Sequence, residues 1–326
     1  MKVVIPVAGI GTRLRPHTHT IPKALITVAG KPILGHILDA VVPLGPDEIV
    51  LIVGYMGERV VDYVNREHSE LPIRYATQTE RRGLGHAIYS AREFLAPGGP
   101  VLVILGDTIF EADLAAVIRK PWSSIGVMEV ADPRRFGVVV VKDGFAVKLV
   151  EKPETPVSNL AIAGIYHFLD ARRLAACVAE VVEGGILTKG EFQLTDALQL
   201  LLDRGEKIET FRLDGWYDCG KQETLLETNR YLLSKRGGGL RIDGSVVVPP
   251  VAVSREARIE RSVLGPYVSV AAGAVIRDSV VKDSIINRNA TVERSLLTAS
   301  LVGENAVVQG AFRKLNVGDD SEVDLG

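Results

Sequence analysis

Glycine, arginine and lysine residues follow the first apolar run of the sequence. The run Val3 to Ala8 leads directly into Gly9-Ile10-Gly11-Thr12-Arg13, and Lys23 stands downstream. At the end of a strand, glycines let the backbone approach a polyphosphate and turn its N–H groups toward the oxygens. This pattern predicts a loop that binds a nucleoside triphosphate, although a tight turn without a ligand uses the same residues. The nucleotide-binding residues expected in it are Ala8, Gly9, Gly11 and Thr12.

Two other phosphate motifs are excluded here. A dinucleotide fingerprint needs a third glycine where Leu14 stands, and a Walker A loop needs a hydroxyl residue where Gly30-Lys31-Pro32 ends. The run Gly9 to Pro16, followed by Pro22-Lys23, instead resembles the signature of the sugar-phosphate nucleotidyltransferases, also called nucleotide-sugar pyrophosphorylases. Within that family the chain is most similar to glucose-1-phosphate thymidylyltransferases and uridylyltransferases that carry a C-terminal β-helix.

Two aspartates stand beside glycines at the ends of apolar runs. Asp107 follows Leu105-Gly106, and Asp218 lies in Trp216-Tyr217-Asp218-Cys219-Gly220. A Gly-Asp pair also caps helices, which is the structural alternative for Asp107. The family resemblance implies that Asp107 and Asp218 hold Mg²⁺ against the phosphates, which suits a hard cation that accepts a few carboxylates. Cys219 is expected to be a small, partly buried side chain rather than a reactive thiol.

A fourth motif concerns the base. Gln78 is followed by Gly83 and then by a predicted helix, and an amide can read a pyrimidine edge. In the thymidylyl and uridylyl members a glutamine and a glycine at this spacing contact the base, so the resemblance assigns that role to Gln78 and Gly83. Some members have proline where this chain has Arg81. His86 is interpreted as a residue of the helix start.

A fifth motif concerns the sugar phosphate. Lys152 stands between Glu151 and Pro153, and by itself such a pair is typical of a solvated surface. The resemblance implies that Lys152 binds the sugar 1-phosphate and that Glu151 accepts hydrogen bonds from sugar hydroxyls. The flanking stretches, Phe136 to Val139 and Asn159 to Tyr166, would line the sugar pocket. The residues selected from these stretches are Gly137 and Asn159.

The reaction implied by the resemblance is an in-line displacement. A sugar 1-phosphate oxygen attacks the α-phosphorus of the triphosphate, and pyrophosphate leaves. The attacking phosphate is already anionic, so no general base is needed, and catalysis consists of holding two anions together. The expected catalytic residues are Arg13 on the leaving pyrophosphate, Lys23 on the α-phosphate and Lys152 on the sugar phosphate.

Alternating strand and helix patterns must position these residues. The predicted strands are Val3 to Ala8, Glu48 to Val53, Ile73 to Ala76, Val101 to Leu105, Ile125 to Val130, Phe136 to Val141, Ala163 to Phe168 and Ile208 to Leu213. The predicted helices are Ile33 to Val42, Gly57 to Glu67, His86 to Phe94, Leu114 to Arg119, Ala171 to Val182 and Leu194 to Arg204. This alternation predicts a three-layer, Rossmann-like α/β domain over residues 1–235, with a mainly parallel sheet and ligands beyond the carboxyl ends of the strands.

The pattern changes after Arg236-Gly237-Gly238-Gly239, which is interpreted as a linker. Apolar residues then recur every six positions in three runs, between which the register slips: Leu264, Val270 and Ile276, then Ile286 and Val292, then Val302 and Val308. A second set follows four positions later: Val268, Ala274, Val280, Ala290, Leu296 and Ala306. This period is typical of a parallel β-helix with one inward residue per face, and the runs resemble left-handed hexapeptide-repeat domains. We expect such a domain over residues 240–326, with a plain antiparallel sheet as the alternative.

Composition narrows the class of partner. The chain has 326 residues, a formal net charge of −2 and two cysteines. Neither nucleic acid nor a membrane is favoured as a partner, and no disulfide framework is indicated. The beginning of the sequence has no signal-peptide pattern, so we expect a cytoplasmic protein.

Several alternatives stay open at this level. The first is a regulatory subunit that senses a sugar phosphate or nucleotide, although the charged site residues are all present. A second is acetyl transfer on the β-helix, as in long relatives, which needs a histidine there; all six histidines lie at or before His167. The β-helix is therefore interpreted as an assembly or regulatory module, with a homo-oligomer expected. The base, dTTP or UTP, and the sugar, glucose or N-acetylglucosamine 1-phosphate, also remain open.

Overall fold

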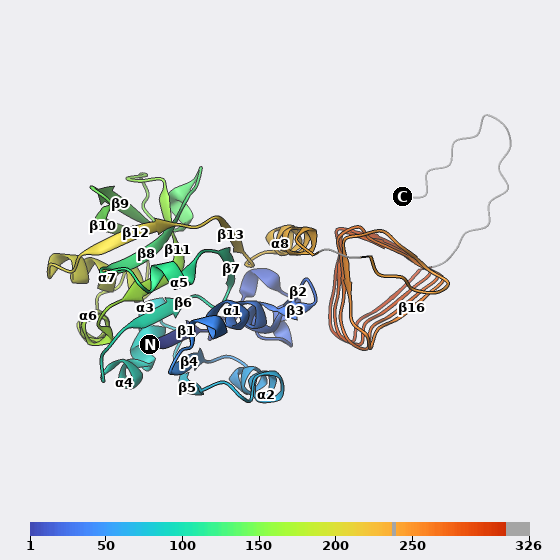
Figure 1. Cartoon of the computed structure of the whole chain (residues 1–326), viewed down its shortest axis with the longest axis horizontal. Coiled ribbons are helices and arrows are strands. Elements are labelled where there is room, and N and C mark those ends of the chain that lie inside the picture. Colours follow the sequence, from blue (N-terminus) through green and yellow to red (C-terminus); the bar gives the residue numbers. More distant parts are fainter. Residues whose placement is uncertain (237–238, 311–326) are drawn as a thin grey trace. The chain divides into compact units, whose positions relative to one another are not determined.

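The protein is described here by a computed structural model that covers residues 1–236 and 239–310 (Figure 1). The predicted linker at 236–239 therefore falls partly outside the described residues. Internal contacts divide the chain into a first unit, Met1–Thr228, and a second unit, Asn229–Gly326. In the described residues no helix is long and apolar enough to cross a membrane.

A nine-stranded sheet forms the centre of the first unit, in the order β5-β4-β1-β6-β11-β8-β12-β10-β9. Its strands are β1 Lys2–Pro6, β4 Glu48–Val53, β5 Ile73–Thr77, β6 Val101–Ile104, β8 Ser123–Glu129, β9 Gly137–Lys142, β10 Phe145–Glu151, β11 Leu160–Phe168 and β12 Ile208–Arg212. Only β11 and β10 run against the other strands, as their antiparallel pairings show. The prediction of an α/β domain with a mainly parallel sheet is confirmed.

Burial on both faces explains why the strands read as continuous apolar runs. On β1, Val3, Val4 and Ile5 are all fully buried although neighbouring side chains point to opposite faces. Val4 belongs to a core cluster that includes Ile88, Val178 and Leu198 from three helices. The sheet is therefore a central layer covered on both faces.

The helices agree with the predicted ranges apart from their ends. They are α1 Ile33–Val41, α2 Gly57–Glu67, α3 Leu84–Ser90, α4 Arg92–Leu95, α5 Leu114–Val117, α6 Ala171–Glu183, α7 Leu194–Asp203 and α8 Gln222–Ser234. The single helix predicted from His86 to Phe94 is divided at Ala91 into α3 and α4. Helix α8 was not predicted, because polar Thr228 and Asn229 interrupt its apolar spacing.

Short elements complete the first unit around the strand ends. They are the 3₁₀ turns η1 Thr12–Leu14, η2 His17–His19, η3 Lys23–Leu25, η4 Val42–Leu44 and η5 Pro133–Arg135, and the paired strands β2 Thr27–Val28 and β3 Lys31–Pro32. A separate ribbon pairs β7 Thr108–Glu111 with β13 Gly215–Asp218. In this ribbon Asp218 lies opposite Thr108, so the two segments that carry the predicted metal ligands are neighbours.

The second unit is a parallel β-helix, drawn almost end-on as a triangular coil in Figure 1. Within the described residues, each of its three faces contains four stacked parallel strands. The first face has β14 Val246–Val247, β17 Val263–Leu264, β20 Val280–Lys282 and β23 Leu296–Thr298. The second has β15 Val251–Val253, β18 Val268–Val270, β21 Ile285–Ile286 and β24 Leu301–Val302. The third has β16 Arg258–Glu260, β19 Val275–Arg277, β22 Thr291–Glu293 and β25 Val307–Gln309.

The six-residue series fills the interior of this coil. Leu264, Val270 and Ile276 are at most 1% exposed and belong to one core cluster. The second series is only partly interior: Val280 and Leu296 are 41% and 81% exposed, so the expectation for these two is wrong. The reason is a shift of register, since their neighbours Val281 and Leu297 take the inward positions.

Within the second unit, the last residues of α8 are bound to the coil. Asn229 donates from Nδ2 to the carbonyl of Tyr267 at 3.1 Å and accepts from Ser269 at 2.6 Å. Arg230 forms a bidentate ion pair with Asp283. These polar contacts explain why asparagine and arginine stand in the helix where apolar residues would continue its spacing.

Candidate active site

The glycine loop after β1 forms one wall of a cavity of about 480 Å³. Ala8, Gly9, Gly11 and Thr12 all line it. Gly11 has φ +69°, and a Cβ there would lie 3.0 Å from the Cβ of Lys23, so the turn requires glycine. A Cβ on Gly9 would meet no protein atom within 4 Å, so its hydrogen faces open space. The loop therefore exposes bare backbone to the cavity, as a phosphate-binding loop must.

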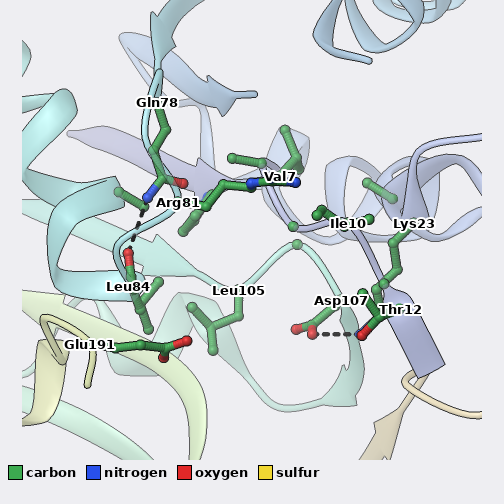
Figure 2. A pocket seen from close by; sticks show the side chains of 18 residues that line it. Val7, Ile10, Thr12, Lys23, Gln78, Arg81, Leu84, Leu105, Asp107 and Glu191 are labelled. Atoms are coloured by element: carbon green, nitrogen blue, oxygen red, sulfur yellow. Dashed lines mark hydrogen bonds and ion pairs between the residues drawn. The ribbon is translucent and has the colours of Figure 1, made fainter. Parts of the chain in front are cut away.

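Lys23 and Asp107 meet at one end of this cavity. Lys23 Nζ lies 2.7 Å from Asp107 Oδ2, and Lys23 is only 7% exposed (Figure 2). Loss of water around Asp107 by itself raises the pKa of the carboxyl. That effect is outweighed by the positive charge of the Lys23 ammonium and by hydrogen bonds from Lys23 and Thr108. The charge of Arg13 adds a smaller contribution, so the pKa of Asp107 lies below its usual value. Asp107 is therefore an anion held next to a buried cation.

Arg13 and Asp218 lie beside this pair without lining the cavity. The backbone N–H of Cys219 donates to the carbonyl of Asp107 at 3.2 Å. A Cβ on Gly220 would lie 2.7 Å from Asp218 Oδ1 and 2.8 Å from an Arg13 guanidinium nitrogen, so both side chains contact this glycine. Burial raises the pKa of the Cys219 thiol to about 12. Cys219 is fully buried and its thiol stays protonated, so it is not a reactive side chain.

The opposite end of the cavity contains Gln78 and Gly83. Both line it, together with Leu84 and Ala87 from the start of α3. Gln78 donates from Nε2 to the carbonyl of Gly83 at 3.1 Å, which Figure 2 marks as a dashed line. The two residues predicted to contact the base are therefore hydrogen-bonded to each other, and they lie across the cavity from the glycine loop.

A second cluster surrounds Glu151 at the end of β10. Thr195 donates to Glu151 Oε2 at 2.6 Å, and Lys152 Nζ lies 3.4 Å from Glu151 Oε1. A Cβ on Gly137 would approach both the Glu151 and the Thr195 oxygens to 2.9 Å. Gly137, Glu151 and Lys152 thus lie together around the Glu151 carboxylate. Asn159 lies apart from them, exposed, with Nδ2 donating to Glu129 at 2.7 Å.

Tyr166 connects the two clusters electrostatically. Its side chain is 4% exposed, and burial raises the pKa of its hydroxyl strongly. The negative charges of Glu151 and Asp107 raise that pKa further, so both carboxylates are close enough to act on the same phenol. The Asp107 end of the cavity and the Glu151 cluster therefore both lie within electrostatic range of Tyr166.

Three polar residues of this site have no counterpart in the sequence predictions. Arg81 and Glu191 line the cavity, and Thr195 holds Glu151. Arg81 appeared only as a departure from the family pattern. Glu191 and Thr195 precede or begin α7, where polar residues are indistinguishable from a helix cap in sequence.

A cation could be held by Asp107 and Asp218. In residues 1–236 and 239–310 no group of three or more His, Cys, Asp or Glu side chains is arranged for a metal ion. Two carboxylates on neighbouring backbone segments, with the remaining positions left to phosphate oxygens and water, match the preference of Mg²⁺. The donor set therefore fits a divalent cation that binds together with a phosphorylated ligand.

Comparison with known proteins agrees with this arrangement. The chain is 36% identical over 332 residues to the bifunctional protein GlmU of Methanocaldococcus jannaschii, covering 94% of this chain and 78% of that protein. It is 31% identical over 359 residues to a glucose-1-phosphate thymidylyltransferase of Streptomyces griseus, covering 100% and 99%. A crystal structure of UDP-glucose pyrophosphorylase complexed with UDP-glucose is similar with a TM-score of 0.62 and 26% identity, covering 72% and 99%. The sequence model of the nucleotidyl transferase family matches residues 2–235, and the chain belongs to that family.

Proposed function

We propose that this nucleotidyltransferase transfers a nucleotidyl group from dTTP or UTP to a sugar 1-phosphate, with glucose 1-phosphate as the first choice. The observation that carries the proposal is the contact of Lys23 with Asp107 at the end of the glycine-lined cavity. The relatives named thymidylyltransferase and UDP-glucose pyrophosphorylase support the choice of substrates. The products would be a nucleotide sugar and pyrophosphate.

Each cation of the site has a separate role in this proposal. Lys23 would contact the α-phosphate from within the cavity, and Arg13 would contact the leaving pyrophosphate. Lys152, already beside Glu151, would bind the phosphate of the sugar. These charges offset the repulsion between two phosphorylated substrates and hold them for in-line attack. No side chain has to remove a proton, because the attacking phosphate is an anion.

The sugar hydroxyls are assigned to the Glu151 cluster. Glu151 is held by Thr195 and stays beside Gly137, whose missing side chain leaves room next to the carboxylate. Asn159 is retained as a proposed sugar residue, but its bond to Glu129 would have to be exchanged for one to the ligand.

Members of the family generally use a divalent metal, and we propose Mg²⁺ for this chain. Asp107 and Asp218 would hold it. Asp107 Oδ2 already accepts from Lys23, and Oδ1 has only a 3.4 Å contact with Thr108, so Oδ1 is the atom offered to the cation. When bound, the ion would neutralise charge on the phosphates.

Two alternatives keep the fold but change the activity. The GlmU relative supports N-acetylglucosamine 1-phosphate as a second sugar, and its name records a second function. Acetyl transfer is not proposed here, since no histidine occurs after His167. A regulatory subunit is disfavoured because Arg13, Lys23, Asp107, Lys152 and Asp218 are all retained.

We propose that the chain consists of a catalytic domain, 1–235, and a left-handed β-helix domain, 240–326. For the β-helix domain we propose an assembly role in a homo-oligomer. Its first face carries an outward row in register, Val246, Val263, Val280 and Leu296. Three of these side chains are 58%, 41% and 81% exposed. A second copy would cover this aliphatic row. Light scattering of Leu296→Glu should then show a smaller particle than the wild type; an unchanged mass would contradict this surface.

The cytoplasm is the proposed compartment, since Cys177 and Cys219 are both free and buried.

The activity is tested by release of pyrophosphate from the purified full chain with Mg²⁺. Four nucleoside triphosphates are combined with glucose, N-acetylglucosamine and other sugar 1-phosphates. We expect release with dTTP or UTP and glucose 1-phosphate. Release with no combination would overturn the proposal, and release only with N-acetylglucosamine 1-phosphate would favour the alternative sugar.

A further inference from the structure

The amide nitrogen of Gln78 has two partners. Nε2 donates to the Gly83 carbonyl at 3.1 Å, and the same atom lies 3.3 Å from His86 Nδ1. A carbonyl oxygen can only accept, so the atom that faces it must be the amide nitrogen rather than the amide oxygen. His86 Nδ1 must then also accept. The orientation of the Gln78 amide is therefore determined by two acceptors that lie on one side of it.

This orientation leaves Gln78 Oε1 as the polar atom offered to a ligand. Gln78 is 7% exposed and lines the cavity. In Figure 2 the nitrogen is directed along the dashed line toward the backbone of the next helix, and the oxygen is directed toward the side of Arg81. A base in this part of the cavity would therefore meet an acceptor, and it must supply an N–H to satisfy it.

The surroundings of His86 keep its ring neutral. Burial lowers the pKa of His86, and the positive charge of Arg82 lowers it further, against a smaller opposite effect from the Glu80 charge and backbone. The other ring neighbours are uncharged: Phe192 is stacked with a centroid distance of 6.4 Å, and Tyr89 lies at 6.3 Å. A neutral ring whose proton is on Nε2 has a lone pair on Nδ1.

We propose that His86 is a positioning residue for base selection: by accepting from Gln78 Nε2 it holds Gln78 Oε1 toward the base, so that the site favours uracil or thymine over cytosine. Uracil and thymine carry an N–H at ring position N3, whereas cytosine has a lone pair there. Two facing acceptors lose a hydrogen bond and leave buried groups unsatisfied. This inference rests on the proposed function, because it assumes that a nucleobase occupies the Gln78 end of the cavity.

Two variants separate positioning from packing. His86→Asn keeps an acceptor close to the position of Nδ1, and His86→Phe keeps the ring but has none. We expect His86→Phe to lower the ratio of kcat/KM for UTP over CTP about tenfold, the size of one lost hydrogen bond, through KM rather than kcat. His86→Asn should retain the wild-type ratio. An unchanged ratio in His86→Phe, or an equal loss in both variants, would overturn the proposal.

The wild-type protein provides a test that needs no substitution. Protonation of His86 places an N–H opposite the Gln78 N–H, so preference for uracil should weaken at acidic pH. The change should come at a lower pH than for an ordinary histidine, because burial and Arg82 lower the pKa of His86. The measurement is the ratio of UMP to CMP affinity by calorimetry. Titration of the phosphate is common to both ligands and cancels in the ratio. A ratio that is constant with pH in the wild type would contradict the proposal.

The binding measurements also separate this inference from the proposed activity. If the wild type releases no pyrophosphate but its preference for UMP over CMP depends on His86, the activity is wrong and the inference stands. If pyrophosphate is released with unchanged base preference in His86→Phe, only the inference fails. Arg74→Ala serves as the control, because its guanidinium lies over Phe94 at 5.9 Å and Arg74 does not line the cavity.

Discussion

Ion pairs of similar length occur in both units of the protein, in very different surroundings. In the first unit, Lys23 lies 2.7 Å from Asp107. In the second, Arg277 lies 2.9 Å from Glu260 and 2.9 Å from Glu293, along the third face of the β-helix. Lys23 is buried and pairs with the partly exposed Asp107 in the lining of a cavity, whereas the Arg277 side chain is 38% exposed on a regular sheet face.

Distance alone therefore says little about what an ion pair does. Burying a charge costs free energy that must be recovered from partners, so a buried lysine that faces a carboxylate in a cavity indicates a ligand or a catalytic role. An exposed ladder of charges is screened by water and salt and adds little to stability. The charged residues of the first unit therefore serve ligand binding or catalysis. The stability of the second unit comes from its buried aliphatic side chains.

The largest effect is expected from Asp107→Ala. Removing the carboxylate eliminates a proposed metal ligand and leaves Lys23 without its 2.7 Å partner. Turnover should fall by roughly 10²- to 10³-fold, the scale of losing one electrostatic contact in an active site. Initial rates of pyrophosphate release measure this, with the thermal midpoint as the control for folding. Near-normal turnover in a folded variant would remove Asp107 from the mechanism.

The converse is expected for Ile276→Ala in the β-helix. Ile276 is fully buried between neighbouring coils, and truncation leaves a cavity there. The second unit should lose about 2–5 kcal/mol of stability. Turnover per folded molecule should not change, because no charged group of the first unit is touched. Denaturant unfolding and initial rates measure the two quantities, and a large loss of turnover at low temperature would break the separation between the units.

Local sequence patterns predict some of the site residues, whereas the positions of others depend on tertiary pairing. Gly9, Gly11 and Asp107 could be predicted because each follows an apolar strand, where a parallel sheet places its ligands. The proximity of Asp218 to Asp107 depends on the β7–β13 ribbon, which joins segments far apart in sequence. No local pattern indicates that pairing, and only the family resemblance suggested it.

Other residues were missed or misplaced for the same physical reason. Thr195 is brought to Glu151 by the packing of α7 against β10, and nothing near Thr195 in sequence distinguishes it from a cap. In the β-helix the six-residue period predicted the interior correctly, but coils of unequal length shifted the register. Val280 and Leu296 therefore point outward, with Val281 and Leu297 inward.

A smaller effect on the first unit is expected from Gly137→Ala. The added methyl would lie 2.9 Å from oxygens of Glu151 and Thr195, closer than such contacts allow. The Glu151 carboxylate must move, so KM for the sugar 1-phosphate should rise about tenfold, which corresponds to about 1.4 kcal/mol. KM for the nucleotide should stay constant, since Gly137 does not line the cavity. Equal changes in both constants would show that the two clusters do not act separately.

Burial of His167 should make the free energy of unfolding depend on pH. It is 1% exposed on β11, neither ring nitrogen has a hydrogen-bond partner in the described residues, and burial lowers its pKa. Below the usual value of 6.5 the unfolded chain binds a proton that the folded chain does not, so stability falls as pH decreases. The contribution is at most about 1.4 kcal/mol per pH unit. Urea unfolding of the wild type and His167→Phe measures it, and parallel pH profiles would contradict it.

The smallest effect is expected from Arg277→Gln. The substitution removes both ion pairs of Arg277 and leaves Glu260 and Glu293 on the same face of the coil. Since all three side chains are in contact with water, only a slight decrease in the unfolding midpoint of the second unit is expected at low salt. Screening by added salt should abolish even this difference. A large decrease that persists at high salt would mean that charge contributes to the second unit as strongly as its interior, and the contrast with Lys23 and Asp107 would then be one of function only.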